Sequence, residues 1–199
     1  MKTIIALLFS ALFAFTSDGQ GTLVFDQESS NDENYVGGGG RIQFYGTVGQ
    51  SFTPSLSTVG FFRVKLGDIT PNNAVGATLV INLRSNAFNG PILGTTTPVA
   101  LSDGFNSSVD FFLPTAVSVL PGTMYFFQVV VQTGDNVNIT IRQDSLGDLN
   151  YPGGDFYANS GPFTAADLWF REGIVVPEPS ISALLLGGGV FAWLIRKRP

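Results

Sequence analysis

Carboxylates are the side chains in this sequence best suited to hydrolytic chemistry. The chain has no histidine and no cysteine, which excludes the Ser-His-Asp triad, thiol nucleophiles, thiolate zinc and nearly all catalytic zinc sites. A glycosidase, in contrast, needs only two acids that face each other across a cleft. The candidates are Asp144, Asp148, Asp155, Asp167 and Glu172. Four of them lie in or beside turns, where Asp ordinarily caps the backbone, so we expect a protein that is not an enzyme.

Some of these acids also offer oxygen ligands for a cation. Asp144 and Asp148 precede a Gly-Gly bend that leads to Asp155, and Ca²⁺ takes about 6–8 oxygens from loops of this kind. The segment lacks the spacing of an EF-hand loop and its bidentate Glu. Two interpretations stay open: a calcium site at these three residues, and a solvated loop in a protein without a cofactor, which the sequence favours.

Aromatic residues gather in the same part of the sequence. A sugar site needs a flat aromatic platform and a few polar partners. The candidate carbohydrate contacts are Tyr151, Phe156, Tyr157 and Trp169. The alternative is that these rings pack in the interior: in a closing strand over residues 167–171, one of Trp169 and Phe170 must point inward.

The charge balance argues against nucleic acid as a partner. The chain carries 10 basic and 15 acidic residues, and Lys2, Arg196, Lys197 and Arg198 lie near its two ends, so the middle is the more acidic. Nucleic-acid binding requires a basic stripe. Without cysteine no disulfide can stabilise the domain, and a hydrophobic core must do so.

Strands are the elements that must position these residues. Apolar and polar residues alternate in Phe61–Leu66, Leu79–Arg84 and Val137–Arg142, as in strands with one buried face. Val109–Leu113 and Met124–Val131 are more uniformly apolar, which predicts strands buried on both faces.

Turn signals separate these runs. Pro121-Gly122-Thr123 predicts a type II turn before an apolar strand. Between the two terminal segments no stretch has helical spacing with caps, and Gly37 to Gly40 indicate a mobile connection. About nine or ten strands predict an all-β fold, an antiparallel β-sandwich with a jelly roll preferred to an immunoglobulin-type fold and a smaller open barrel as the alternative.

Four turn-rich motifs occur in order within this domain, which we place at residues 20–173. They are Gly49-Gln50-Ser51-Phe52-Thr53, Asn89-Gly90-Pro91, Leu120-Pro121-Gly122-Thr123 and Tyr151-Pro152-Gly153-Gly154. The domain resembles the choice-of-anchor group of bacterial surface domains. This resemblance implies a passive surface module and no enzymatic role.

The first residues are typical of a secretory signal peptide. Met1-Lys2 precedes the apolar run Ile4–Phe15, and small or polar residues follow. We predict a signal helix within residues 1–19, export through the secretory translocon, and cleavage by signal peptidase before Ser17 or Gln20. An uncleaved anchor is the alternative, although the run is shorter than the ~20 residues of a usual membrane span.

Residues 174–199 form a predicted sorting tail in three parts. Pro177, Glu178 and Pro179 precede an apolar run, predicted as a transmembrane helix over 181–195, and Arg196, Lys197 and Arg198 follow as the topology anchor in the basic end 196–199. This order resembles the PEP-CTERM sorting signal of exopolysaccharide-producing bacteria. The resemblance implies an exosortase-like membrane protease as partner, a transient stay in the inner membrane, and a cell-surface or extracellular-matrix destination.

The sequence thus predicts an exported, non-enzymatic surface or matrix protein that is sorted through its C-terminal signal. A calcium-dependent, lectin-like module that binds exopolysaccharide is the alternative. A carboxylate glycosidase is the least favoured of the three.

Overall fold

Strands make up nearly all of the regular structure in the computed structural model, which describes residues 21–29, 32–35, 37–143, 151–159 and 161–178. The predicted signal helix in 1–19, the predicted transmembrane helix over 181–195, Pro179, and Arg196, Lys197 and Arg198 lie outside the described residues. Within the described part, Leu23–Val175 forms one compact unit.

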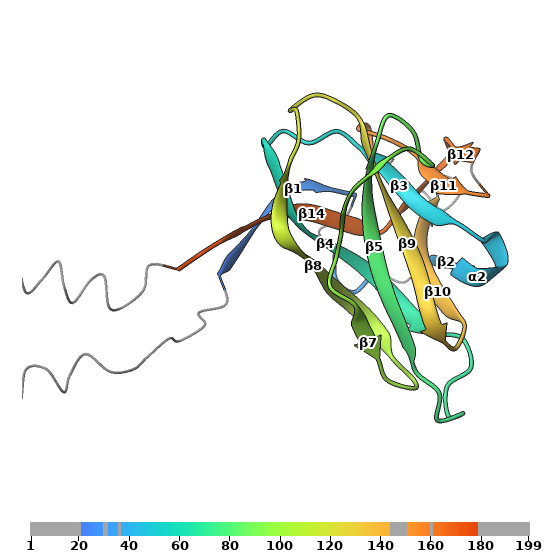
Figure 1. Cartoon of the computed structure of the whole chain (residues 1–199). Helices are drawn as coiled ribbons and strands as arrows, with labels where there is room; N and C mark the ends of the chain where they lie inside the picture. Colours follow the sequence, from blue (N-terminus) through green and yellow to red (C-terminus); the bar gives the residue numbers. More distant parts are fainter. Residues whose placement is uncertain (1–20, 30–31, 36, 144–150, 160, 179–199) are drawn as a thin grey trace, which may run out of the picture. The chain divides into compact units, whose positions relative to one another are not determined.

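Two sheets form this unit (Figure 1). The first sheet has the order β1 (Thr22–Glu28), β14 (Phe170–Val176), β4 (Thr58–Asp68), β10 (Val137–Gln143) and β13 (Ala166–Leu168), with β2 (Gly38–Arg41) beside β10 and β8 (Asn106–Ser118) beside β4. The second sheet has the order β12 (Gly161–Phe163), β11 (Phe156–Ala158), β3 (Val48–Phe52), β9 (Tyr125–Gly134), β5 (Ala77–Ser85) and β6 (Ile92–Thr95), with β7 (Val99–Leu101) beside β5. Neighbours such as β4 and β8 or β5 and β9 pair antiparallel. The predicted all-β, antiparallel class is confirmed.

The core lies between the inward faces of the two sheets. Phe62 and Phe170 of the first sheet meet Phe52 and Phe127 of the second, with ring centroids 5.1 Å apart for Phe62 and Phe127 and 5.3 Å apart for Phe127 and Phe170. Each buried ring contributes roughly 1.5–3 kcal/mol of hydrophobic stabilisation. This aromatic core is what holds a domain that has no disulfide.

As predicted, every second residue of β4, β5 and β10 enters the core. The expectation that the other face meets water is wrong at Phe61 and Val80, which are 0% and 4% exposed. In the run Met124–Val131, Tyr125 to Val129 of β9 are buried on both faces as predicted, whereas Met124 is 45% exposed and Val130 and Val131 are half-buried. The same prediction is wrong for β8: Phe111 is buried, but Phe112 beside it is 39% exposed. Within the described part of the sheet, β8 pairs only with β4 and its outer face is open to solvent.

The predicted mobile connection at Gly37 to Gly40 is also wrong. Gly38 to Arg41 form β2, in which Gly40 pairs with Ile139 of β10. A Cβ atom on Gly40 would lie 2.7 Å from Ile141 Cδ1, so the missing side chains allow this close pairing. The following short helix, α2 (Ile42–Tyr45), buries Ile42 and has no side-chain cap, which explains why no sequence signal announced it.

The turn at Leu120 to Thr123 forms as predicted. The Thr123 amide donates to the Leu120 carbonyl at 3.1 Å, and Gly122 has a φ of 76°. A positive φ at the third residue after a proline at the second defines a type II turn.

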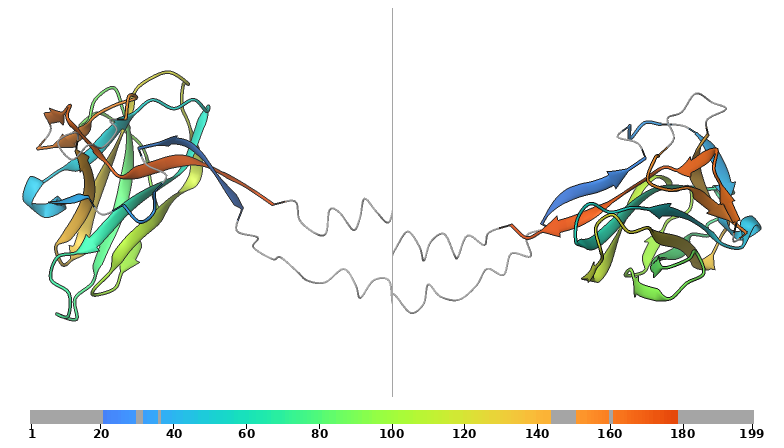
Figure 2. Two further views of the ribbon diagram at one scale, coloured as in Figure 1. Left: turned by 180° about the vertical axis from the view of Figure 1, so that it is seen from behind. Right: turned by 90° about the horizontal axis from the view of Figure 1, so that it is seen from above.

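The chain enters and leaves the domain through neighbouring strands. β1 and β14 are adjacent in the first sheet, and both views show the beginning of β1 beside the end of β14 (Figures 1 and 2). Their backbones are close, because a Cβ atom on Gly173 would lie 2.0 Å from the Val24 carbonyl oxygen. The closing strand expected over 167–171 is interrupted at Trp169, which separates β13 from β14.

Candidate functional site

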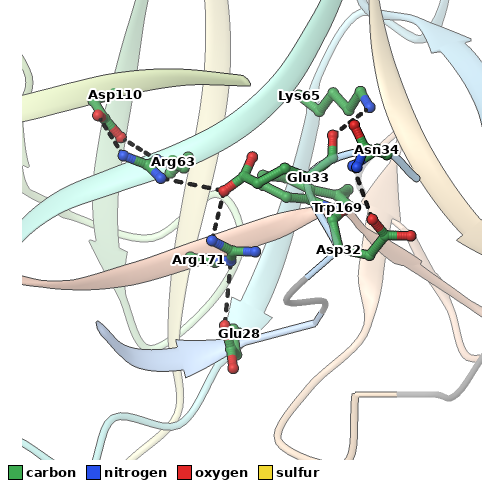
Figure 3. Close-up of polar contacts among 9 residues, drawn as sticks. All are labelled: Glu28, Asp32, Glu33, Asn34, Arg63, Lys65, Asp110, Trp169 and Arg171. Carbon is green, nitrogen blue, oxygen red and sulfur yellow. Dashed lines mark hydrogen bonds and ion pairs between the residues drawn. The ribbon is translucent and has the colours of Figure 1, made fainter. Parts of the chain in front are cut away.

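Basic side chains converge on the outer face of the first sheet (Figure 3). Since Phe62, Val64 and Leu66 of β4 enter the core, the alternating Arg63 and Lys65 point to the opposite face. Arg171 of β14 lies beside them, next to Trp169. Alternation along two neighbouring strands therefore brings three cations together in a protein with a net charge of −5.

The segment Asp32–Tyr35, which we call the acidic strap, covers this face. Lys65 Nζ donates to the main-chain carbonyls of Glu33 at 3.0 Å and Tyr35 at 2.6 Å. Trp169 Nε1 donates to the Asp32 carbonyl at 2.9 Å. Side chains of the sheet thus hold the strap by its carbonyl oxygens.

Two arginines share the carboxylate of Glu33. Its Oε1 atom lies 2.6 Å from Arg171 Nη1 and 3.3 Å from Arg63 Nη1. Arg171 Nε also lies 3.2 Å from a Glu28 oxygen. The side chain of Arg171 is only 7% exposed, whereas that of Glu33 is 42% exposed, so the guanidinium forms the floor and the carboxylate lies above it.

Arg63 is fixed by a second carboxylate. Its Nε and Nη2 atoms donate to the two oxygens of Asp110 at 2.6 and 2.8 Å. This parallel pair of charge-assisted bonds is the strong geometry for arginine, and it raises the pKa of Arg63 against the opposing effect of burial.

Aromatic rings complete the floor of the cluster. The guanidinium carbons of Arg63 and Arg171 lie 5.3 and 5.2 Å from the centre of the Phe25 ring, and that of Arg171 lies 5.0 Å from the Trp169 ring. Cation–π contacts of this kind stabilise a partly desolvated guanidinium.

The arrangement is chemically suited to hold a carboxylate. Two guanidinium groups lie over an aromatic floor and hold the carboxylate of Glu33, while the Lys65 ammonium group binds main-chain carbonyls of the acidic strap. The cluster can therefore bind a carboxylate through charge pairing. The sequence indicated this cluster only weakly. Arg63 and Arg171 each lie at an outward position of an apolar strand, but the local sequence does not show that the two strands are neighbours.

The four predicted carbohydrate contacts do not form one platform. Tyr151 and Phe156 belong to the core, and Trp169 is 0% exposed at the cluster on the first sheet. Tyr157, on the other face of β11 from Phe156, stacks on Phe88 with ring centroids 4.9 Å apart. Alternation along β11 separates the two adjacent rings. Interior packing therefore describes Tyr151 and Phe156, whereas Trp169 is covered by the acidic strap on the outer face and Phe170 is the neighbour that points inward.

The predicted acids are also dispersed. Asp144 and Asp148 lie outside the described residues. Asp155 lies in a turn against β3, where its amide donates to Ser51 Oγ at 2.7 Å and its carbonyl accepts from the Ser51 amide at 2.9 Å. Among the residues that the structure describes, no group of three acidic side chains is placed to hold a metal ion.

Asp167 and Glu172 are buried and do not flank an open cleft. The Asp167 carboxylate accepts from Gln50 Nε2 and from the Tyr151 amide, each at 2.6 Å. Burial raises the pKa of Asp167 against these bonds. Of the five acids, four are expected in or beside turns; Asp167 and Glu172 lie instead in β13 and β14, which carry them into the interior.

An open groove of about 380 Å³ brings two of the predicted residues together. Its lining is Thr53, Met124, Tyr151, Pro152, Gly153, Gly154 and Asp155. The Tyr151 hydroxyl donates to Gln27 Oε1 at 2.9 Å and accepts from the Thr53 amide at 3.3 Å. The groove combines an apolar wall with one carboxylate.

The described part of the predicted sorting motif lies directly after the domain. β14 ends at Val176, and Pro177 and Glu178 are exposed. Within the part of the chain that the structure describes, no helix has the length and apolar character needed to cross a membrane.

Fold and site together define an all-β domain with a carboxylate-holding cluster on one sheet and an exposed Pro-Glu pair after its last strand. No protein-family model matches the chain, and no curated protein matches its sequence. Its function must therefore be inferred from its own residues.

Proposed function

We propose that this protein is an exported bacterial surface or matrix protein, without enzymatic activity, that is sorted through its C-terminal signal. The observation that carries the proposal is the position of Pro177 and Glu178: they are exposed and follow the last strand of the domain without an intervening element. In the sequence, the apolar run 181–195 and a basic segment follow them.

The exposure of the segment at the end of β14 supports proteolytic processing there. Val175 and Val176, the last residues of β14, are 37% and 42% exposed. Proteases cut exposed, extended segments in preference to packed ones. Cleavage near Pro177-Glu178-Pro179 would leave the core residues of β14, such as Phe170, in place.

The proposed route begins with the signal peptide in residues 1–19, the translocon and signal peptidase. The run 181–195 then halts transfer, and Arg196, Lys197 and Arg198 stay on the cytoplasmic side. An exosortase-like protease processes the tail and delivers a jelly-roll domain to the cell surface or extracellular matrix. The burial of Asp167 and Glu172 supports a non-enzymatic role.

The test is a variant in which Pro177, Glu178 and Pro179 are all replaced by alanine, expressed in the bacterium that makes the protein. We expect full-length protein to accumulate in the membrane fraction and the processed form to disappear from the surface fraction, as measured by immunoblotting. Pro98→Ala, at an exposed loop position, serves as the control and should be processed normally. Normal processing of the triple variant would exclude the proposed signal.

The groove at Tyr151 and Asp155 favours one second candidate, a calcium-dependent, lectin-like module for exopolysaccharide. It predicts that the protein binds the producer's polysaccharide on a glycan array and that a chelator abolishes this binding. Asp155→Asn should weaken binding, while Glu178→Gln, at an exposed acid outside the groove, should not. Binding that ignores both the chelator and Asp155→Asn would contradict this function.

A further inference from the structure

Glu172 is a buried acid to which no described residue donates a hydrogen bond. Its side chain lies on the inward face of β14, because Arg171 before it points to the outer face and Phe170 enters the core. It is 0% exposed, and neither carboxyl oxygen accepts a hydrogen bond from a described residue. An ionised carboxylate in this position would lack any compensation for its lost hydration.

The polar neighbour of Glu172 is a second carboxyl group, that of Asp26 in β1. Asp26 has many donors: its Oδ2 atom accepts from the amides of Ser55 at 2.8 Å and Leu56 at 2.9 Å, and its Oδ1 atom accepts from the Ser55 hydroxyl and from Gln27 Nε2. These bonds favour the ionised form and lower the pKa of Asp26 against the effect of burial.

Two carboxyl groups in contact cannot both be ionised without a proton or a cation between them. Glu172 has no donor in the described part of the chain, so it is the group that gains by being neutral. A protonated Glu172 would supply the hydrogen bond that joins the two groups.

We propose that Glu172 is protonated and donates a hydrogen bond to ionised Asp26. This acid pair links β1, the Ser55–Leu56 segment and β14, and the link depends on pH. Three segments far apart in the sequence meet at the pair. β4 contributes the apolar Phe62 opposite Glu172.

Other titratable groups reinforce the neutral form of Glu172. Burial first, and the charge of Asp26 second, raise the pKa of Glu172 to about 9. Tyr151 lies near the pair and is itself neutral, since burial raises its pKa to about 12, with Glu172, Asp26 and Asp167 adding to the shift. Asp167 on β13 is a third acid at this end of the domain, and it raises the pKa of Tyr151 in the same direction as Glu172 and Asp26.

The folded pKa of Glu172 lies above its ordinary value of 4.5. The unfolded chain therefore gives up this proton first, and stability falls as the pH rises from about 5 towards 9. Above this range two buried negative charges would repel each other and loosen β1 from β14.

The test compares the melting temperature of the full-length protein, in a mild non-ionic detergent, between pH 5 and pH 8. For the natural protein we expect a fall of roughly 3–5 °C per pH unit. Glu172→Gln should remove most of this slope and melt higher at pH 8, because an amide donates to Asp26 at every pH. Glu178→Gln, at an exposed acid that follows the domain, is the control and should keep the slope. An unchanged slope in Glu172→Gln, or a lower melting temperature at pH 8, would overturn the proposal.

A measurement on the natural protein decides the question if Glu172→Gln does not fold. NMR of the protein with ¹³C-labelled glutamate carboxyls should show one glutamate that titrates far above the others. If all of them titrate below about pH 6, the proposal fails. It also fails if millimolar calcium restores the melting temperature at pH 8, since a cation rather than a proton would then join the two acids.

Discussion

At the scale of the residue, Arg171 links more partners than any other side chain of the carboxylate-holding cluster. It pairs with Glu28 and Glu33 and stacks against Phe25 and Trp169 while almost fully buried. A surface ion pair contributes at most about 1 kcal/mol. A buried guanidinium with planar partners contributes more, because it combines directed hydrogen bonds with aromatic contact.

We therefore expect Arg171→Lys to lower the free energy of unfolding by about 1–2 kcal/mol although the charge is kept. The ammonium group cannot bridge Glu28 and Glu33 through separate nitrogens, and it loses the stacked plane. Urea denaturation measures the change, with Arg41→Lys, at an exposed position, as the control. Equal losses in the two variants would show that only the charge of Arg171 matters.

Residue patterns predicted part of this site. The alternation of Phe170, Arg171 and Glu172 in one strand places the glutamate on the inward face, so its burial could have been inferred from sequence. The meeting of Glu172 with Asp26, and of Arg63 with Arg171, could not, because each contact depends on which strands become neighbours. Periodicity within a strand carries no such information.

At the scale of the element, long strands with clear alternation were predictable and short ones were not. The burial of β4, β5, β9 and β10 follows from their own residues. β2 consists mainly of glycine and has no side-chain pattern; it forms because β10 offers a partner that glycine can approach closely. β8 appeared buried on both faces because its own residues do not show that the outer face of the sheet is left uncovered at Phe112.

The pairing of β1 with β14 depends on Gly173. A Cβ atom at this position would overlap the Val24 carbonyl oxygen, so Gly173→Ala should displace β1 and lower the free energy of unfolding by about 2 kcal/mol or more. Gly38→Ala, in β2, is the matched control, since a Cβ atom there meets no other atom within 4 Å. Thermal unfolding followed by circular dichroism measures both. If the two variants behave alike, β1 and β14 are not in close contact.

At the scale of the whole molecule, aromatic side chains from both sheets form one core, which stabilises a domain without disulfide bonds. Rings from both sheets pack together between Phe62 and Phe127, so neither sheet is expected to unfold alone. Trp169 reports on the outer face of the first sheet, while circular dichroism reports on all strands. In a Trp193→Phe variant, which leaves Trp169 as the single tryptophan, the two signals should change at the same urea concentration. Separate midpoints would show that the cluster on the first sheet melts independently of the core.

The neighbouring positions of β1 and β14 make this domain a natural candidate for circular permutation. Because the beginning of one strand lies beside the end of the other, a short glycine-serine linker from Val175 to Leu23 could join them. New termini could then be opened at the exposed Pro121-Gly122 turn, and by the same geometry the domain could be inserted into a surface loop of an unrelated host protein.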